Sequence, residues 1–198
     1  MKKFTLPTLA MWALLLASSH VFAVDGKITV NGAVTDGTCT LRPTKIHPGT
    51  GMKNIMIPMA AVPKSSFTAT NTLQGRTNIF LDLVNGAGDY CDEAQNIAFK
   101  GIHLSPISAT DLDESDKTLL INKATGASVK NPVFIQLSVS GGNVPVNLSQ
   151  PWNTQGRNAV YGHSQAVHVS YQVNYISKTG IVDAQNVTAR VNYTLHYN

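Results

Sequence analysis

The sequence predicts a single all-β domain, and three observations support that fold class. Apolar and polar residues alternate over short stretches from residue 27 to the C-terminus, which is the pattern of half-buried strands. Gly, Pro, Asn and Asp bound these stretches, as they do at turns. Apolar residues at helical spacing are scarce. Many short strands in one chain of 198 residues favour a β-sandwich.

The expected strands follow one another along most of the chain. In order, they cover residues 27–35, 39–42, 54–57, 79–84, 97–104, 133–139, 144–148, 167–176 and 187–197. Two polar stretches rich in turn-forming residues, 59–75 and 109–120, are expected to be loops or weak helices. We find no internal repeat and no linker-like segment, so one domain is expected after export.

Residues 1–23 have the pattern of a secretory signal peptide. Lys2 and Lys3 precede an apolar run, and Val21-Phe22-Ala23 places small residues at the positions that a signal peptidase requires. A membrane anchor would need about 20 apolar residues, and this run is shorter. The mature protein is therefore expected to begin near Val24 and to be soluble after export.

Composition argues for an extracellular protein and gives no reason to expect nucleic acid as a partner. The net charge is +4, of which Lys2 and Lys3 contribute two, and charged residues make up 13% of the chain. Globular domains usually have about 25% charged residues. The surface is thus expected to be polar and weakly charged.

The chain has two cysteines, Cys39 and Cys91, and both follow the signal peptide. An oxidising compartment favours a disulfide between them, which could stabilise the fold by about 4 kcal/mol. The competing interpretation is a catalytic or metal-bound thiol, but neither cysteine belongs to a CxxC motif or has a nearby histidine.

The first and last expected strands carry sustained one-sided patterns. Near the N-terminus, Ile28, Val30, Gly32 and Val34 share one face of an extended segment. At the C-terminus the apolar face comprises Val187, Ala189, Val191, Tyr193, Leu195 and Tyr197. Terminal segments normally fray, so these faces must be buried either inside the domain or on a partner.

Motifs that suggest catalysis or metal binding are incomplete. Gly162-His163-Ser164-Gln165-Ala166 approaches a nucleophile elbow, but Ala166 replaces a glycine and a strand is expected to follow. The acidic cluster resembles a calcium loop without its glycine and final glutamate, so a solvated turn is expected at Asp111, Asp113, Glu114 and Asp116. The histidines are scattered. We therefore expect no enzyme activity, no metal and no cofactor.

Several segments together resemble the subunits of chaperone–usher fimbriae, such as type 1 and P pili. The segment from Gly26 to Cys39 resembles the start of these subunits, with Gly32 preceding Cys39 by the interval that marks their donor strand. The resemblance continues through residues 80–83, 133–137 and 173–197, including the penultimate tyrosine. Many members of the family have a glycine at the position of Gln185, and here residues 180–184 look like that motif displaced upstream.

The resemblance implies an incomplete immunoglobulin-like sandwich that lacks its seventh strand, with a groove beside the C-terminal strand. It implies that residues 24–36 are a donor-strand extension and residues 37–198 the pilin domain. Ile28, Val30, Gly32 and Val34 would fill a neighbour's groove. A periplasmic chaperone would first bind the C-terminal strand, at Val191, Tyr193, Leu195, Tyr197 and Asn198.

The expected function is that of a structural subunit of a surface fimbrium that supports adhesion. It would be exported through the periplasm, passed to an outer-membrane usher and joined to identical or homologous subunits. The alternative is a minor tip or adaptor subunit, or an adhesin that binds a host glycan or protein. Tip adhesins of this family usually have a receptor-binding domain before the pilin domain and lack the donor extension, so a shaft subunit is favoured. A secreted hydrolase would need a cleft with convergent polar groups.

Overall fold

The computed structural model describes residues 38–198, apart from residues 47–48, 142, 158 and 163–164. The signal peptide, the donor-strand extension and the strand expected at 27–35 lie outside the described residues. In the described part, no helix is long and apolar enough to cross a bilayer.

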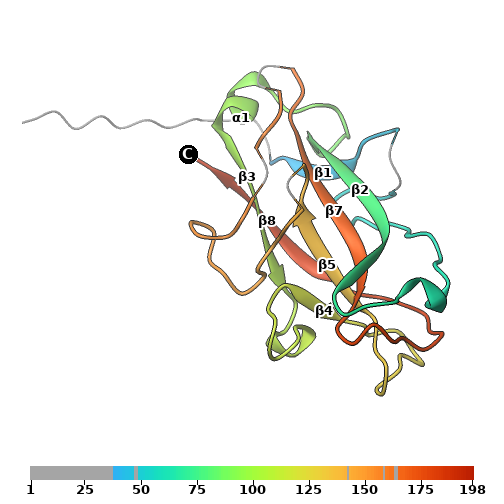
Figure 1. Ribbon diagram of the computed structural model, residues 1–198. Helices are drawn as coiled ribbons and strands as arrows, with labels where there is room; N and C mark the ends of the chain where they lie inside the picture. The colour runs from blue at the N-terminus through green and yellow to red at the C-terminus, as the bar shows by residue number, and fades with distance from the viewer. Residues whose placement is uncertain (1–37, 47–48, 142, 158, 163–164) are drawn as a thin grey trace, which may run out of the picture. The chain divides into compact units, whose positions relative to one another are not determined.

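The described chain forms two antiparallel sheets (Figure 1). The main sheet has the order β1-β2-β7-β5-β4, and β6 pairs with β5. The second sheet pairs β3 with β8. Their bounds are β1 Thr40–Pro43, β2 Thr72–Val84, β3 Phe99–Pro106, β4 Leu119–Ile121, β5 Phe134–Val139, β6 Val144–Pro145, β7 His168–Ser177 and β8 Val191–Tyr197.

One hydrophobic core lies between the two sheets. Leu41 of β1, Leu83 of β2 and Val169 of β7 come from the main sheet, and Ile102 and Leu104 of β3 come from the second. Each of these side chains is nearly inaccessible to solvent. Side chains from the inner faces of two packed sheets form the core of a β-sandwich, so the predicted fold class is confirmed.

A disulfide joins Cys39, immediately before β1, to Cys91. The sulfur atoms are 1.99 Å apart, and the bond closes a separation of 52 residues. The predicted pairing is thus confirmed. It ties the first described strand to the segment that leads into α1, Glu93–Ala98.

Several element boundaries differ from the prediction. Residues 54–57 are not a strand, because only Met56 pairs, in an isolated bridge with Thr50. The expected loop 59–75 contains a 3-10 turn at Lys64–Ser66 and gives way to β2 at Thr72. The expected loop 109–120 begins with a 3-10 turn at Ala109–Asp111 and runs into β4. The expected strands 97–104 and 144–148 are shifted or shortened to β3 and β6.

The physical reasons for these differences are local. β2 extends further than expected because it pairs with β7 on both sides of an irregularity. The register shifts between Gln74 and Thr77, where Gly75 has φ +63°, and the strand continues past this point. α1 forms because Asp92 Oδ1 accepts a hydrogen bond from the Gln95 amide at 2.7 Å, while Gln95 Oε1 accepts from the Asp92 amide. This capping box stabilises a helix too short to show apolar periodicity.

Candidate interaction site

Among the described strands, the last one, β8, has a partner on one edge only. It pairs with β3 from Phe99↔Tyr197 to Pro106↔Val191. In the part of the chain that the structure describes, no strand pairs with the opposite edge of β8. An unpaired edge presents a row of N–H and C=O groups that can bind another extended segment.

The outer edge of β3, by contrast, is covered by a side chain. Gln155 is 5% exposed, and its Oε1 accepts a hydrogen bond from the Leu104 amide at 2.9 Å. Its Nε2 donates to the Leu104 carbonyl at 2.7 Å and to the Asn147 carbonyl at 3.0 Å. Gln155 therefore satisfies the backbone of β3 as a neighbouring strand would, and β8 supplies the open edge of this sheet.

Beside the open edge, apolar side chains are only partly covered. In β8 and the residues before it, apolar side chains alternate with exposed ones such as Arg190, Asn192 and Thr194. Further half-buried apolar side chains lie on the segment after β1, and Cys39 lies immediately before β1. We call the whole set the apolar strip: Cys39, Ile55, Ile57, Met59, Val187, Ala189, Val191, Tyr193 and Leu195. Each member packs on the core without being fully buried, so another segment covering the strip would remove further apolar surface from water.

Tyr193 connects the two sides of the apolar strip. Its hydroxyl lies 3.1 Å from Thr40 Oγ1 of β1, and it donates to the Lys53 carbonyl at 3.0 Å. No backbone ladder joins β8 to β1 among the described residues. The Tyr193 side chain thus holds β8 to β1 where backbone pairing is missing.

The C-terminal end of β8 lies next to α1. Tyr197 packs edge-on against Phe99 with ring centroids 5.6 Å apart, and it is 42% exposed. Partial burial raises the pKa of its phenol. The Asn198 amide donates to the Ala98 carbonyl at 3.1 Å. The predicted apolar face is therefore present on β8, with Tyr197 its most exposed member.

The start of the last strand is now defined. β8 begins at Val191, whereas the strand was expected from residue 187. Thr188 is instead bonded to the segment before β5, since its carbonyl accepts from the Lys123 amide and its amide donates to Asn122 Oδ1. Gln185, where relatives were expected to have glycine, accepts from Asn122 Nδ2 at 3.0 Å and donates to the Asn131 carbonyl at 3.1 Å.

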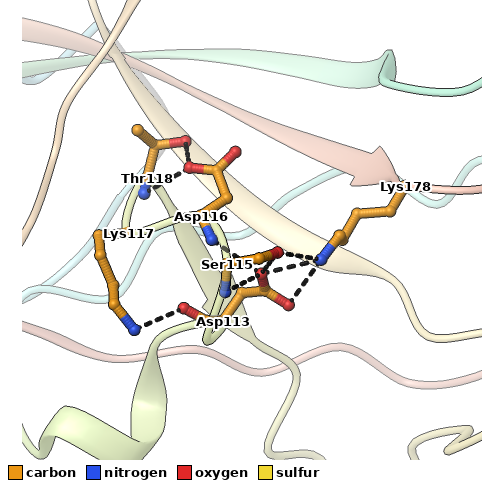
Figure 2. Close-up of polar contacts among 6 residues, drawn as sticks. All are labelled: Asp113, Ser115, Asp116, Lys117, Thr118 and Lys178. Atoms are coloured by element: carbon orange, nitrogen blue, oxygen red, sulfur yellow. Dashed lines mark hydrogen bonds and ion pairs between the residues drawn. The ribbon is translucent and has the colours of Figure 1, made fainter.

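The acidic cluster includes a turn that is held by side-chain hydrogen bonds and by an ion pair with Lys178 (Figure 2). Both carboxylate oxygens of Asp113 accept from Lys178 Nζ, at 2.9 and 3.0 Å, and Asp116 accepts from the amide and hydroxyl of Thr118. Hydrogen bonds from Lys178 and Ser115 hold the pKa of Asp113 at about 2, although burial acts in the opposite direction. The Lys178 ammonium is thus bound to both oxygens of Asp113, the carboxylate that a calcium ion would need as a ligand.

Of the other sequence candidates that the structure describes, His103 and His196 lie together, with ring centroids 6.1 Å apart. His163 and Ser164 lie outside the described residues, as does His47. Sequence reasoning missed a stacked group on the second sheet, in which Trp152 lies parallel to His196 at 4.0 Å and Arg157 lies over the same Trp152 ring. Adjacent aromatic and cationic residues in loop and strand gave no recognisable motif for this stack.

Comparison with known proteins finds bacterial fimbrial subunits that are similar to this chain. The chain is 30% identical over 183 residues to the major fimbrial subunit SMF-1 of Stenotrophomonas maltophilia, covering 89% of this chain and 94% of that protein. It is 29% identical over 181 residues to the F17 fimbrial protein of Escherichia coli, covering 91% of this chain and 92% of that one. No protein-family model matches the chain.

Solved structures show the same fold. The crystal structure of the P pilus rod subunit PapA has a TM-score of 0.53 at 19% identity, covering 87% of this chain and 99% of that one. A chaperone–usher pilus structure, described in terms of rod uncoiling, has a TM-score of 0.50 at 18% identity, covering 88% of this chain and 96% of that one.

The fold is thus that of a pilin domain: an immunoglobulin-like sandwich that lacks one strand. The chain belongs to the family of bacterial fimbrial subunits. It is a structural subunit of a pilus.

Proposed function

We propose that this subunit polymerises by donor-strand exchange, in which an extended segment of one subunit fills the apolar strip of the next. The observation that carries the proposal is the coincidence of the open β8 edge with half-buried apolar side chains along the same strand. An added strand gains backbone hydrogen bonds from such an edge and specificity from alternate side chains.

The donor is the N-terminal extension, about residues 26–36, with Ile28, Val30, Gly32 and Val34 directed at the strip. A one-residue slip would instead direct Lys27, Thr29 and Asn31 at it. Burying their polar atoms against an apolar strip without partners would cost free energy. Gly32 suits a position where the incoming backbone lies close to the acceptor.

Before assembly, a periplasmic chaperone occupies the same edge, and an outer-membrane usher then receives the subunit. Val191, Tyr193 and Leu195 provide the contact face on β8, and Tyr197 with the carboxylate of Asn198 provides its end. An unprotected edge beside apolar surface makes a free subunit prone to aggregate, so export through the periplasm requires such a cover.

Deletion of residues 24–34 tests the donor assignment. The truncated subunit should remain folded on its chaperone, because the proposal places this segment in a neighbour's groove and not in its own core, and it should fail to form fibres. A synthetic peptide of residues 24–36 should bind it and raise its melting temperature, whereas a peptide with Gly32 replaced by Leu should bind more weakly.

Fibres assembled from the truncated subunit, counted by electron microscopy, would show that another segment is the donor. A truncated subunit that unfolds on its chaperone would show that the extension belongs to its own domain. Either result would exclude donor-strand exchange as proposed.

A further inference from the structure

A cavity of about 730 Å³ opens on the outer face of the main sheet, where β1, β2 and β7 lie side by side. Ligand sites in proteins commonly have volumes of about 300–1,000 Å³. Arg42 of β1, Phe80 and Asp82 of β2 and His168 and Ser170 of β7 line the cavity. Side chains outside these strands, among them Lys45, Tyr90 and Tyr161, complete its lining.

The carboxylate of Asp82 is buried in this cavity without a hydrogen bond. Asp82 is 4% exposed, and its oxygens lie 3.8 Å from Arg42 Nη2 and 3.7 Å from His168 Nδ1. Both separations exceed hydrogen-bond range, and no described residue donates to the carboxylate. Burial raises the pKa of Asp82, although Arg42 and His168 both act to lower it. A buried carboxylate that lacks donors is uncommon and indicates that the cavity accommodates a group able to donate.

The surrounding side chains combine donors with aromatic surface. Arg42 donates from Nη1 to the Gly88 carbonyl at 2.6 Å, lies 5.8 Å from the centre of the Tyr90 ring and has a buried Nε without a partner among the described residues. Tyr90 and Tyr161 are 47% and 49% exposed. Half-exposed tyrosine rings offer a flat apolar face with a polar tip.

We propose that this cavity binds a carbohydrate, with hydroxyls of a pyranose ring donating to Asp82 and the apolar face of the ring lying on tyrosine. Arg42 and Lys45 disfavour a cationic ligand by like-charge repulsion, and the buried Asp82 carboxylate disfavours a simple anion. A sugar supplies both the donors that Asp82 lacks and acceptors for the neighbouring cations. Its ring presents C–H groups that pack on an aromatic face.

The cavity is independent of the apolar strip. Successive residues of a strand point to opposite faces, so Arg42 faces the cavity while Leu41 is buried in the core. A donor strand beside β8 therefore does not need to cover the cavity. Sugar binding adds a function to the structural subunit and does not depend on how the subunits are joined.

The test is ligand-observed saturation-transfer NMR on fibres purified from cells that express the full chain. The probes are methyl β-D-galactopyranoside, N-acetylglucosamine and glucuronic acid, with inorganic phosphate and lysine as ionic controls. The first two sugars are neutral and the third is acidic, so the set shows whether a sugar carboxylate adds to binding. We expect at least one sugar to bind with a dissociation constant of about 1 mM, which is modest affinity.

Asp82→Asn should weaken that binding about tenfold, because the amide replaces a charged acceptor by a weaker one. Tyr161→Ala removes half-exposed ring surface, is expected to leave the core intact and should weaken binding even if Asp82→Asn fibres do not form. Asp89→Asn, the same chemical change at an exposed residue outside the cavity, should leave binding unchanged.

Three results would overturn the proposal. The first is that none of the three sugars binds at concentrations up to about ten times the expected dissociation constant. The second is that Tyr161→Ala and Asp89→Asn fibres bind sugar equally well. The third is that phosphate or lysine saturates the site in place of sugar, which would make it an ionic site.

Discussion

Tyr193→Phe should destabilise the pilin domain although it removes only a hydroxyl. That hydroxyl makes two hydrogen bonds, to Thr40 Oγ1 at 3.1 Å and to the Lys53 carbonyl at 3.0 Å. A hydrogen bond contributes about 0.5–1.5 kcal/mol net. Because the hydrogen bond to Lys53 is exposed to solvent, the Lys53 carbonyl can bind water once the Tyr193 hydroxyl is removed. We therefore expect a loss of about 1–2 kcal/mol in the free energy of unfolding.

Urea unfolding of the mature subunit, followed by the fluorescence of Trp152, measures this loss. Residue 152 is the one tryptophan that follows the expected signal peptide, and it stacks on His196 of β8. The midpoint should fall by about 0.5–1 M urea for a slope typical of a domain of this size. Tyr161→Phe is the matched control, because its hydroxyl has no hydrogen bond among the described residues.

A cycle with Thr40→Val separates the two hydrogen bonds. The Thr40 and Tyr193 substitutions share one contact, so their combined effect should be smaller than the sum of the single effects by about 0.5–1 kcal/mol. The reasoning is refuted if Tyr193→Phe and Tyr161→Phe unfold at the same urea concentration, or if the two substitutions are additive.

Three further predictions concern stability. Replacing Cys39 and Cys91 by Ser should lower the unfolding free energy by about 4 kcal/mol, seen as a lower urea midpoint that reducing agent no longer changes. Asp113 has a pKa near 2, below its usual 3.8, so its contribution is complete above pH 4 and is lost as the pH falls toward 2. Asp113→Asn should remove this acid-dependent loss, about 1 kcal/mol after solvent screening; an unchanged acid transition would refute the assignment. Gln155→Leu leaves the Leu104 amide and carbonyl unpaired and should cost about 1–3 kcal/mol, whereas Gln150→Leu should cost little because its side chain makes no hydrogen bond among the described residues.

Strands with one buried face could be predicted from the sequence, because burial of alternate residues leaves a local pattern. β8, in which partly buried and exposed residues alternate, shows this directly, whereas β7 is buried on both faces. Other elements depend on partners distant in the chain. β4 forms because Leu120 pairs with Ile135, whereas residues 54–57 have apolar alternation but only one bridging residue. α1 depends on a capping box spanning four residues, which alternation cannot reveal.

The candidate interaction site also combines features that leave a local sequence pattern with features that depend on distant residues. The strand that carries the open edge could be predicted, because the alternation at the C-terminus continues to the penultimate residue. The contacts that define the site could not. Tyr193 and Thr40 are 153 residues apart, and Gln155 and Leu104 are 51 residues apart. No local pattern reports such pairs, and a buried glutamine that satisfies a strand edge looks in sequence like any loop residue.

In the part of the chain that the structure describes, those two contacts together explain why the second sheet is open at β8 and covered at β3. A two-stranded sheet has two outer edges, and both would invite unwanted pairing if left open. On the edge of β3, side-chain hydrogen bonds from Gln155 satisfy the backbone of Leu104, so no further strand is needed there. Among the described residues no strand or side chain covers the free edge of β8 in this way, and Tyr193 reaches β1 with its hydroxyl. Under the proposed donor-strand exchange, an added segment would pair with β8 alone, and each junction between subunits would have one direction. Repetition of one directed, non-reciprocal contact generates a filament and not a closed dimer.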